Sequence, residues 1–263
     1  MRHHLTLNNR QKKILEQLRV KQEVKVSDLR ELFDVTDMTI RRDLEKLEKI
    51  GVARRTFGGA IYISQQNKSN KDILFTQRQL LNKEAKAAIG RIAATYVEEG
   101  DSIFVDAGTT TSHFLRYLPR NMNITVVTNG VNILESIDNE KIEKILIGGL
   151  LRDSTLSLVG PIAEASLDNL YFNKAFLSAS GFTINDGFSN SNNFEVQIKQ
   201  KVITKSTEVT FLVDSSKFGQ QFLHKITSLD KADRLITDNF RFFEEIKKIE
   251  DLGVRLVVCK CLN

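Results

Sequence analysis

The sequence contains few prolines and cysteines and no long apolar run, and each scarcity excludes a class of protein. Only 2 prolines among 263 residues, with 41% hydrophobic and 27% charged residues, argue against a disordered or low-complexity chain. No segment approaches the ~20 apolar residues of a membrane span. Residues 1–7 lack the apolar run of a secretory signal, and both cysteines, Cys259 and Cys261, lie near the C-terminal end. We therefore expect a globular protein in the reducing cytoplasm.

Positive charge is concentrated in the first quarter of the chain. Residues 1–62 contain 14 lysines and arginines and 9 aspartates and glutamates, so this segment carries +5, which is the net charge of the whole chain. The rest is neutral, with 24 residues of each sign. This distribution favours a short module that binds a polyanion, joined to a body with another task, although a randomly uneven surface would look the same.

The pattern of apolar residues predicts helices in this basic module. The first covers residues 9–20, where Ile14, Leu15 and Leu18 recur at helical spacing. A short extended piece at Val24 and Val26 precedes a second helix, which begins at Ser27 and Asp28. We expect the core face of the second helix to consist of Leu29, Leu32 and Phe33.

A third helix has the clearest boundaries. Thr36 is suited to cap its N-terminus, and Asp37 lies where the helix dipole favours an acid. Gly51 is placed to end it. Its buried stripe consists of four apolar residues spaced three or four positions apart, which are Ile40, Leu44, Leu47 and Ile50.

The opposite face of this third helix has the composition of a reader of the DNA major groove. Together with the cap Thr36 it presents Met38, Thr39, Arg41, Arg42 and Lys46. Arginine can donate two hydrogen bonds to guanine, which discriminates between bases by roughly 1–3 kcal/mol, while lysine and hydroxyl groups contact phosphates. Two adjacent arginines alone usually form a solvated basic face. Here a short helix, a tight turn and a capped longer helix occur in the order of a helix-turn-helix.

Two short strands after Gly51 predict a wing. Residues 52–56 and 60–63 are joined by a turn at Phe57-Gly58-Gly59. Arg54 and Arg55 would lie on this hairpin, within reach of the phosphate backbone or the minor groove of a duplex. A plain hairpin that packs onto the helices is the alternative, and the two roles are compatible.

These residues resemble the signature of the DeoR family of bacterial regulators. The resemblance is carried by Thr36-Asp-Met-Thr-Ile-Arg-Arg-Asp-Leu-Glu-Lys-Leu-Glu48, by Gly51 and by Phe57-Gly-Gly-Ala60 at the expected separation. It covers the whole basic module. It implies that residues 6–62 form a winged helix-turn-helix domain that binds double-stranded operator DNA.

A larger α/β domain is predicted over residues 75–263, after a polar linker at 63–74. Residues 75–98 should form one long helix. From residue 101 onward, short apolar runs alternate with helical stretches, which predicts a mostly parallel sheet covered by helices. The runs are 102–105, 124–127, 144–147, 175–177, 209–213, 234–236 and 254–258.

Small and polar residues follow several of these runs, at the carboxyl ends where parallel sheets bind ligands. The segment Asp106-Ala-Gly108-Thr109-Thr110-Thr111 leads into a helix and is suited to phosphate, because free backbone N–H groups point toward an anion there. Thr128 and Asn129 follow the second run, Gly148 and Gly149 the third, and Asp214-Ser-Ser-Lys217 the fifth. Each of these segments alone is compatible with an ordinary turn. Their recurrence at the same edge of the predicted sheet favours a ligand-binding site.

The same segments, with Val159-Gly160, resemble the DeoR effector domain in order, so the resemblance covers nearly the whole chain. It implies a topology similar to ribose-5-phosphate isomerase and glucosamine-6-phosphate deaminase, and hence a phosphorylated sugar as effector. Glu195 and Lys199 lie four apart on a predicted helix, usually an ordinary surface pair, but the resemblance adds Lys199 to the expected site. The expected effector-binding residues are Asp106, Gly108, Thr109, Thr110, Thr111, Thr128, Asn129, Gly148, Gly149, Lys199, Asp214 and Lys217.

The leading hypothesis is a regulator, a repressor of a carbohydrate catabolic operon, whose DNA affinity is controlled by a phosphorylated sugar. One small reader offers few base contacts, so a homodimer or homotetramer assembled through the C-terminal domain is expected. The alternatives are an activator of the same architecture, and a sugar-phosphate isomerase or deaminase with an appended DNA-binding head. In such an enzyme Asp106, Glu195 and Lys199 would be the acid and base groups.

Neither a metal nor a cofactor is expected. Cys259-Lys-Cys261 is a lone C-x-C without a partner pair. The sequence contains no Walker loop and no dinucleotide-binding glycine motif.

Overall fold

The computed structural model describes residues 7–21, 23–50, 52–56, 58–62, 75–137, 139–239 and 243–259. These residues belong to two units, which divide between Lys71 and Asp72. The expected linker at 63–74 lies outside the described residues, as do Gly51 and Phe57. Within the described ranges, no helix is both long and apolar enough to cross a membrane.

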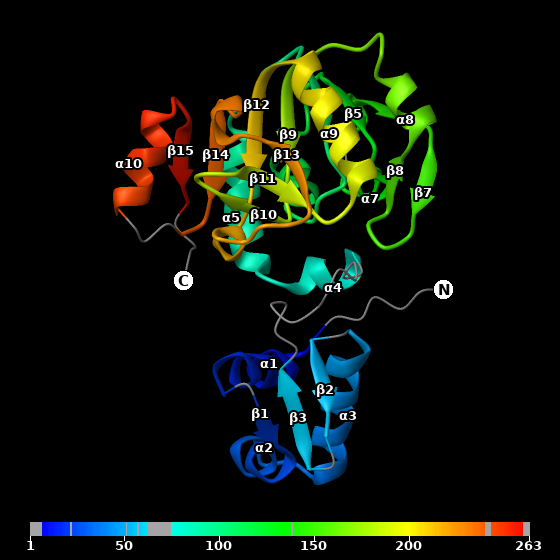
Figure 1. Ribbon diagram of the computed structural model, residues 1–263. Coiled ribbons are helices and arrows are strands. Elements are labelled where there is room, and N and C mark those ends of the chain that lie inside the picture. Colours follow the sequence, from blue (N-terminus) through cyan, green and yellow to red (C-terminus); the bar gives the residue numbers. More distant parts are fainter. Residues whose placement is uncertain are drawn as a thin grey trace. The chain divides into compact units, whose positions relative to one another are not determined.

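The first unit combines helices with a small antiparallel sheet (Figure 1). Its elements are, in order, α1 (Asn9–Lys21), β1 (Glu23–Lys25), α2 (Val26–Phe33), α3 (Asp37–Lys49), β2 (Ala53–Arg55) and β3 (Gly59–Tyr62). The strand order β1-β3-β2 makes β2 and β3 a hairpin whose second strand also pairs with β1. The helix-turn-helix with a following hairpin is therefore present as predicted.

The predicted buried stripes of the first and third helices are confirmed. Ile14, Leu15 and Leu18 of α1 are buried. Ile40, Leu44 and Leu47 of α3 are also buried, as is Ile50, which directly follows this helix. Thr36 caps α3, because its side chain accepts a hydrogen bond from the backbone N–H of Thr39 at 3.4 Å. The face of α3 that remains outside the core is thus fixed by these contacts.

The second helix differs from its prediction. It begins at Val26, which was expected in the extended piece, and Leu32 is 59% exposed although it was expected in the core. The reason is length: α2 has only eight residues, and Val26 and Leu29 occupy its buried face. Asp34, with a φ of 49°, ends the helix in the left-handed conformation.

The second unit is built around a parallel seven-stranded sheet in the order β15-β14-β12-β9-β4-β5-β6. The strands are β4 (Ser102–Val105), β5 (Thr125–Thr128), β6 (Glu143–Leu146), β9 (Phe172–Leu177), β12 (Ser206–Leu212), β14 (Arg234–Thr237) and β15 (Arg255–Val258). Each corresponds to one of the apolar runs in the sequence. The predicted parallel α/β sheet is confirmed.

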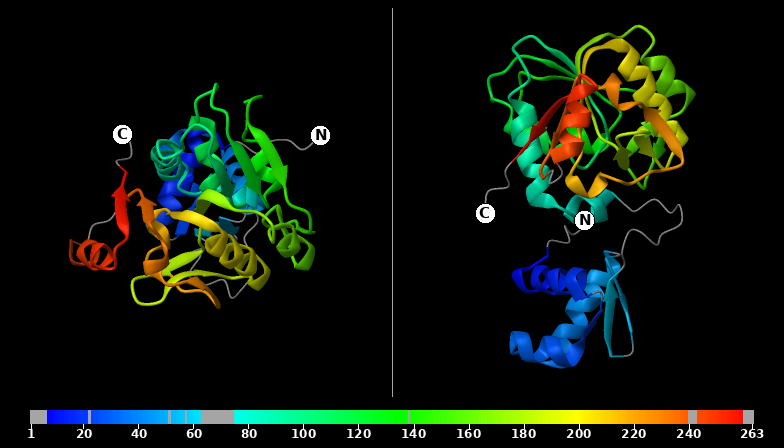
Figure 2. Two further views of the ribbon diagram at one scale, coloured as in Figure 1. Left: turned by 90° about the horizontal axis from the view of Figure 1, so that it is seen from above. Right: turned by 60° about the vertical axis from the view of Figure 1, so that its left-hand side comes forward.

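Helices cover both faces of this sheet, and Figure 2 shows α5 (teal) and α9 (yellow) on opposite sides. Successive strand residues alternate between two cores: Ile103 and Val105 belong to one, and Phe104 to the other. The first core is closed by α5 (Lys83–Ala94), α6 (Thr111–Phe114) and α7 (Val131–Leu134). The second is closed by α8 (Pro161–Ser166), α9 (Asn193–Lys205) and α10 (Phe243–Asp251).

Several short elements outside the main sheet were not predicted. β7 (Leu150–Arg152) and β8 (Ser157–Val159) form an antiparallel pair. β10 (Gly181–Thr183), β11 (Gly187–Asn190) and β13 (His224–Thr227) form a second antiparallel sheet. Single 3₁₀ turns occur at η2 (Leu115–Tyr117), η3 (Ser215–Lys217) and η4 (Leu229–Lys231). Ser157 of β8 forms an isolated β-bridge with Gly130, which places this strand beside the segment that follows β5.

The long helix predicted for residues 75–98 is wrong. The segment forms α4 (Phe75–Leu80) and α5, separated by a turn. Asn82 adopts the left-handed conformation with a φ of 52°, and its side-chain N–H donates to Asp214 at 2.8 Å. A residue in that conformation cannot continue a right-handed helix, and the hydrogen bond to Asp214 helps to hold it there.

Candidate functional site

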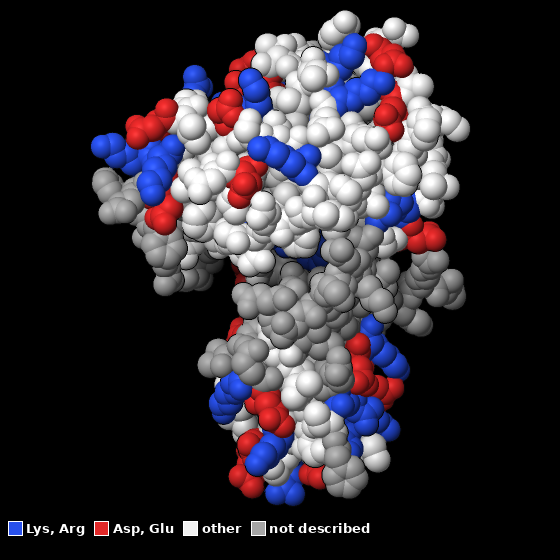
Figure 3. All heavy atoms as spheres, viewed as in Figure 1, with Lys and Arg blue, Asp and Glu red and all other residues white. Residues whose placement is uncertain are grey.

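The first candidate site is the exposed face of α3. Met38, Arg41 and Arg42 are exposed there, whereas Thr39 and Lys46 are partly buried. Thr36 is exposed at the N-terminus, and its hydroxyl also contacts that of Thr39 at 3.0 Å. Figure 3 shows blue and red side chains interspersed on the visible face of this unit. The basic residues therefore form local groups rather than one uninterrupted positive surface on that face.

A buried carboxylate fixes the orientation of α3 against α1. Asp43 is only 3% exposed, and it accepts hydrogen bonds from Arg10 Nε at 2.6 Å and from Gln11 Nε2 at 2.7 Å. The side-chain oxygen of Asn8 in turn accepts a hydrogen bond from the backbone N–H of Gln11 at 2.9 Å, at the start of α1. Sequence reasoning missed this contact, because nothing in the spacing of Arg10 and Asp43 along the chain indicates it.

The hairpin is held to the same helix. The backbone N–H of Arg55 donates to Glu48 Oε1 of α3 at 2.8 Å, and the Arg55 side chain is exposed. The side chain of Arg54 lies outside the described residues. Gly59 is required where β3 passes β1, because a Cβ there would lie 1.9 Å from the carbonyl oxygen of Val24.

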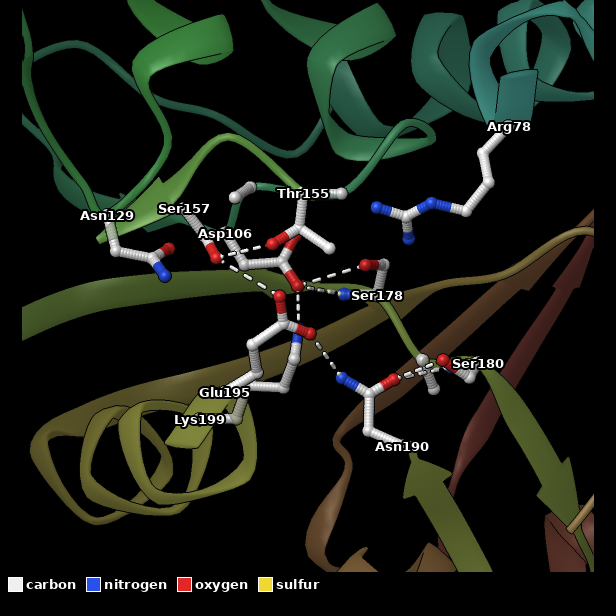
Figure 4. A pocket seen from close by; sticks show the side chains of 13 residues that line it. Arg78, Asp106, Asn129, Thr155, Ser157, Ser178, Ser180, Asn190, Glu195 and Lys199 are labelled. Carbon is white, nitrogen blue, oxygen red and sulfur yellow. Dashed lines mark hydrogen bonds and ion pairs between the residues drawn. The ribbon is translucent and has the colours of Figure 1, made fainter. Parts of the chain in front are cut away.

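The second candidate site is a pocket at the carboxyl ends of the parallel strands in the second unit (Figure 4). It encloses about 400 Å³ of empty space, open solvent at its mouth included. The residues that line it are Arg78, Asp106, Ala107, Gly108, Asn129, Thr155, Ser157, Ser178, Ala179, Ser180, Asn190, Glu195 and Lys199. Its wall is therefore composed almost entirely of polar and small side chains.

Asp106 is the most heavily bonded of these groups. Its Oδ1 accepts hydrogen bonds from the N–H of Gly108 at 3.1 Å and from the hydroxyl of Thr111 at 2.8 Å. Its Oδ2 accepts from both the N–H and the hydroxyl of Ser178 at 2.9 Å and forms an ion pair with Lys199. These contacts join the loop after β4 to the loop after β9 and to α9.

Lys199 and Glu195 project into the pocket from the same helix. Asn192 caps α9 by accepting the N–H of Glu195 at 3.2 Å. Glu195 accepts hydrogen bonds from Ser157 and Asn190, both at 3.0 Å, and its Oε1 lies 3.7 Å from Arg152 Nε. Burial lowers the pKa of Lys199 below the ordinary lysine value, and the nearby guanidinium of Arg78 lowers it further.

Asn129 presents an unfilled hydrogen-bonding position. Its side-chain N–H donates to the carbonyl of Leu158 at 3.3 Å, whereas its buried Oδ1 has no partner among the described residues. A buried acceptor without a donor costs free energy, which a bound hydroxyl or N–H group would recover. The pocket therefore offers an acceptor beside the Asp106 loop.

Of the residues expected to bind an effector, Asp106, Gly108, Asn129 and Lys199 line this pocket. The hydroxyl group of Thr111 is shared between the carboxylate and the backbone carbonyl of Asp106, and that of Thr128 donates to the backbone carbonyl of Val105. Thr109 and Thr110 are buried and do not line the pocket, and α6 beyond them has only four residues. A single turn supports a weaker dipole than the helix expected from the sequence.

The paired glycines after β6 pack against a helix rather than lining the pocket. A Cβ at Gly149 would lie 2.9 Å from the Cβ of Ala163 on α8, and Gly149 has a φ of 134°. A Cβ at Gly148 would lie 3.4 Å from Ile162 of the same helix. Close packing of the β6–β7 turn accounts for the glycine at position 149, and the expected contact of both glycines with a ligand stays a prediction.

Asp214 and Lys217 also do not line the pocket. Asp214 is buried and accepts hydrogen bonds from Asn82 at 2.8 Å and from the N–H of Ser216 at 3.2 Å. Lys86, buried on α5, belongs to the same group of charges: burial lowers its pKa to about 7, Asp214 opposes this, and Lys217 and Arg78 add to it. Arg78 both interacts with this cluster and lines the pocket.

The remaining lining residues were not expected as ligand contacts. Ser178 and Ser180 follow the fourth apolar run of the sequence, at the end of β9, and Glu195 is one helical turn from Lys199. Ser157 and Asn190 lie on the unpredicted antiparallel strands, and Arg78 on the short α4. No group of three or more potential metal ligands occurs in the described part of the chain.

Together these features define a class of protein, a helix-turn-helix transcription regulator with a separate ligand-sensing domain. Residues 10–66 match the DeoR-like helix-turn-helix domain, and residues 81–239 match the DeoR C terminal sensor domain. The chain belongs to the DeoR family. The expected family is therefore confirmed.

Relatives are similar over most of their length. The chain is 40% identical over 248 residues to the HTH-type transcriptional regulator YulB of Bacillus subtilis, which covers 94% of this chain and 95% of that protein. It is 33% identical over 233 residues to the lactose phosphotransferase system repressor of Lactococcus lactis, covering 88% and 90%. These relatives are regulators, and the chain is a DNA-binding transcription regulator rather than an isomerase or deaminase.

A solved ribose-5-phosphate isomerase of Methanocaldococcus jannaschii is also similar to part of the chain. The identity is 17%, the TM-score is 0.39, and the match covers 52% of this chain and 55% of the isomerase. That likeness is too distant to indicate a shared ligand or reaction.

Proposed function

We propose that this regulator represses an operon for carbohydrate use and that a phosphorylated sugar in the pocket changes its affinity for the operator. The observation that carries the proposal is the pocket within the sensor domain, where Asp106, Lys199 and Glu195 converge with amide and hydroxyl side chains. The name of the Lactococcus lactis relative describes that protein as a repressor of the lactose phosphotransferase system.

The chemistry of the pocket suits a phosphorylated sugar. Carboxylates and amides bind sugar hydroxyl groups in fixed directions, and the free Oδ1 of Asn129 is such an acceptor. The ammonium group of Lys199 lies beside them and supplies positive charge for a phosphoryl oxygen. An apolar ligand would leave these polar groups unpaired.

In the proposed complex with DNA, α3 enters the major groove. Arg41 and Arg42 read base edges with Met38, while Thr36, Thr39, Lys46, Arg54 and Arg55 contact the backbone. A single module reads few base pairs, so the protein acts as a homodimer or homotetramer joined through the sensor domain. The sugar must bind the DNA-bound and free arrangements unequally, since equal binding would shift nothing.

The proposal is tested by the melting temperature of the full-length protein in a panel of phosphorylated sugars, each compared with its unphosphorylated parent. A ligand at 100 times its dissociation constant stabilises the folded state by about 2.7 kcal/mol, so one phosphorylated sugar should raise the melting temperature by several degrees. The parent sugar should not.

The matched control is Asp106→Asn, which keeps the shape of the side chain but removes the charge paired with Lys199. This variant should lose the shift caused by the active sugar phosphate. If no phosphorylated sugar stabilises the wild-type protein more than its parent sugar, the proposed effector class is wrong.

A further inference from the structure

Arg78 reaches the pocket from outside the two regions that match family domains. The helix-turn-helix match ends at residue 66 and the sensor match begins at residue 81, whereas Arg78 lies on α4 between them. In Figure 4 its side chain extends from α4 toward Thr155 and Ser178. Part of the pocket wall is thus supplied by the short helix that directly follows the connecting segment along the chain.

Both ends of α4 are tied to the body of the sensor domain. At its start, the N–H of Phe75 donates to the carbonyl of Ser154 at 2.7 Å, and the Phe75 side chain is buried. Ser154 immediately precedes Thr155, which lines the pocket. In its second half, Lys86 Nζ donates to the carbonyl of Arg78 at 2.5 Å. A ligand that binds Arg78 therefore contacts a short helix, and the first hydrogen bond that holds this helix is made by a neighbour of the pocket residue Thr155.

The charges around Arg78 favour an anion. Burial is the largest cause of the lowered pKa values of Lys199, Lys86 and Lys217. The guanidinium group of Arg78 lowers each of these pKa values further. The carboxylates that face these cations are Asp106 and Asp214, while Glu195 lies beside Arg152. Arg78 thus shares the region with three lysines of lowered pKa and with two carboxylates, and a phosphoryl dianion between Arg78 and Lys199 would favour the protonated form of Lys199 and offset its repulsion with Arg78.

We propose that Arg78 binds the phosphoryl group of the effector, so that the bound effector bridges the sensor body and α4. This inference rests on the proposed function and adds the residue through which binding reaches the segment leading to the DNA-binding module. Guanidinium groups are suited to this role because their donors match two phosphoryl oxygens at once. Arg78 variants should therefore bind operator DNA as wild type does but respond weakly to the effector.

The experiment measures the dissociation constants of inorganic phosphate and of glucose 6-phosphate for the full-length protein by calorimetry, with chloride at equal ionic strength as reference. Wild type is compared with Arg78→Gln, with Arg78→Lys, and with Arg120→Gln as a control, since Arg120 is exposed and does not line the pocket. Arg78→Gln should weaken binding of the phosphate-bearing probe at least tenfold. Arg78→Lys should weaken it less, and Arg120→Gln should leave it unchanged.

The outcomes separate this inference from the proposed function. If wild type binds either probe and Arg78→Gln binds it equally well, Arg78 does not hold the phosphoryl group, and the sugar-phosphate effector stands without it. If wild type binds neither probe, Arg78 and Lys199 do not form a phosphoryl subsite and this inference is overturned, whereas the proposed function is decided separately by the panel of phosphorylated sugars. Should Arg78→Gln fail to fold, Arg78→Lys decides: a dissociation constant equal to that of wild type contradicts the inference, and a weakened one supports it.

Discussion

At the scale of single residues, His113 is a buried base that the fold holds in its neutral form. It is only 6% exposed, and its Nε2 has no hydrogen-bond partner among the described residues. Burial lowers the pKa of His113 to about 4, and the nearby cations Arg116, Lys86 and Lys83 add to the effect. Protonation of this imidazole is therefore linked to unfolding of the sensor domain.

The linkage predicts a loss of stability in acid. Between pH 6.5 and pH 4 the unfolded chain binds a proton at His113 that the folded protein does not, so the free energy of unfolding falls as the pH falls through this window. The total loss from this group is on the order of 3 kcal/mol. His113→Leu should show a correspondingly smaller loss in urea unfolding of the sensor domain, measured at pH 4.5 and pH 6.5.

His224→Leu is the control, because His224 is partly exposed on β13. It should keep the pH dependence of wild type over the same range. If His113→Leu and wild type lose the same free energy of unfolding between the two pH values, the imidazole is not the titrating group.

The apolar pattern predicted the site where its residues follow strands of the main sheet, and the family resemblance added Lys199 on α9. Asp106, Gly108 and Asn129 follow β4 and β5, and strand alternation in the sequence places such residues at one rim. Asn190 and Arg78 belong to a small antiparallel strand and to a six-residue helix, whose approach to the pocket depends on tertiary packing. Gly148 and Gly149 do not line the pocket, and the close contacts of Gly149 show that packing can require a glycine where the sequence also allows ligand approach.

At the scale of elements, the DNA-binding module depends on the contact that fixes α3 on α1. Asp43→Ala would leave Arg10 and Gln11 without their shared acceptor in a mostly buried place. Loss of a hydrogen-bonded charged group should cost roughly 1.5–3 kcal/mol of stability in the first unit. We expect a lower melting transition of that unit by circular dichroism and weaker binding to duplex DNA.

Asp37→Ala is a matched control on the same helix. Asp37 is exposed, and its ion pair with Arg30 spans 3.7 Å at the surface. Removal of this carboxylate should lower the free energy of unfolding by about 1 kcal/mol or less, which includes the loss of its favourable interaction with the helix dipole in the first turn. Equal losses in the two variants would mean that the buried contact contributes no more than a surface charge.

Periodicity predicted the elements best where burial was one-sided or complete. All strands of the parallel sheet and the buried stripe of α3 were evident from apolar spacing. The break between α4 and α5 was not, because Asn82 is compatible with a helix and is drawn into the left-handed conformation by a residue more than a hundred positions away. The strands β7, β8, β10 and β11 contain at most two consecutive apolar residues each, too few to stand out as apolar runs.

At the scale of the whole molecule, the excess positive charge and the polar pocket belong to different units. The first 62 residues carry the entire net charge of +5, which suits a polyanion. The polar pocket lies in the second unit, with Arg78 on the element that follows the connecting segment. Control of DNA binding by a sugar phosphate requires that occupancy of the pocket change the affinity of the first unit for DNA.

That requirement is tested most directly by titrating the full-length protein against a duplex from upstream of its own operon, with random-sequence competitor, in the presence and absence of the sugar phosphate that stabilises it most. Fluorescence anisotropy at fixed salt gives the operator affinity in both conditions. The account predicts a clear preference for the upstream duplex and at least a tenfold change in its affinity when the sugar phosphate is added. No preference over competitor, or an affinity that the sugar phosphate leaves unchanged, would contradict it.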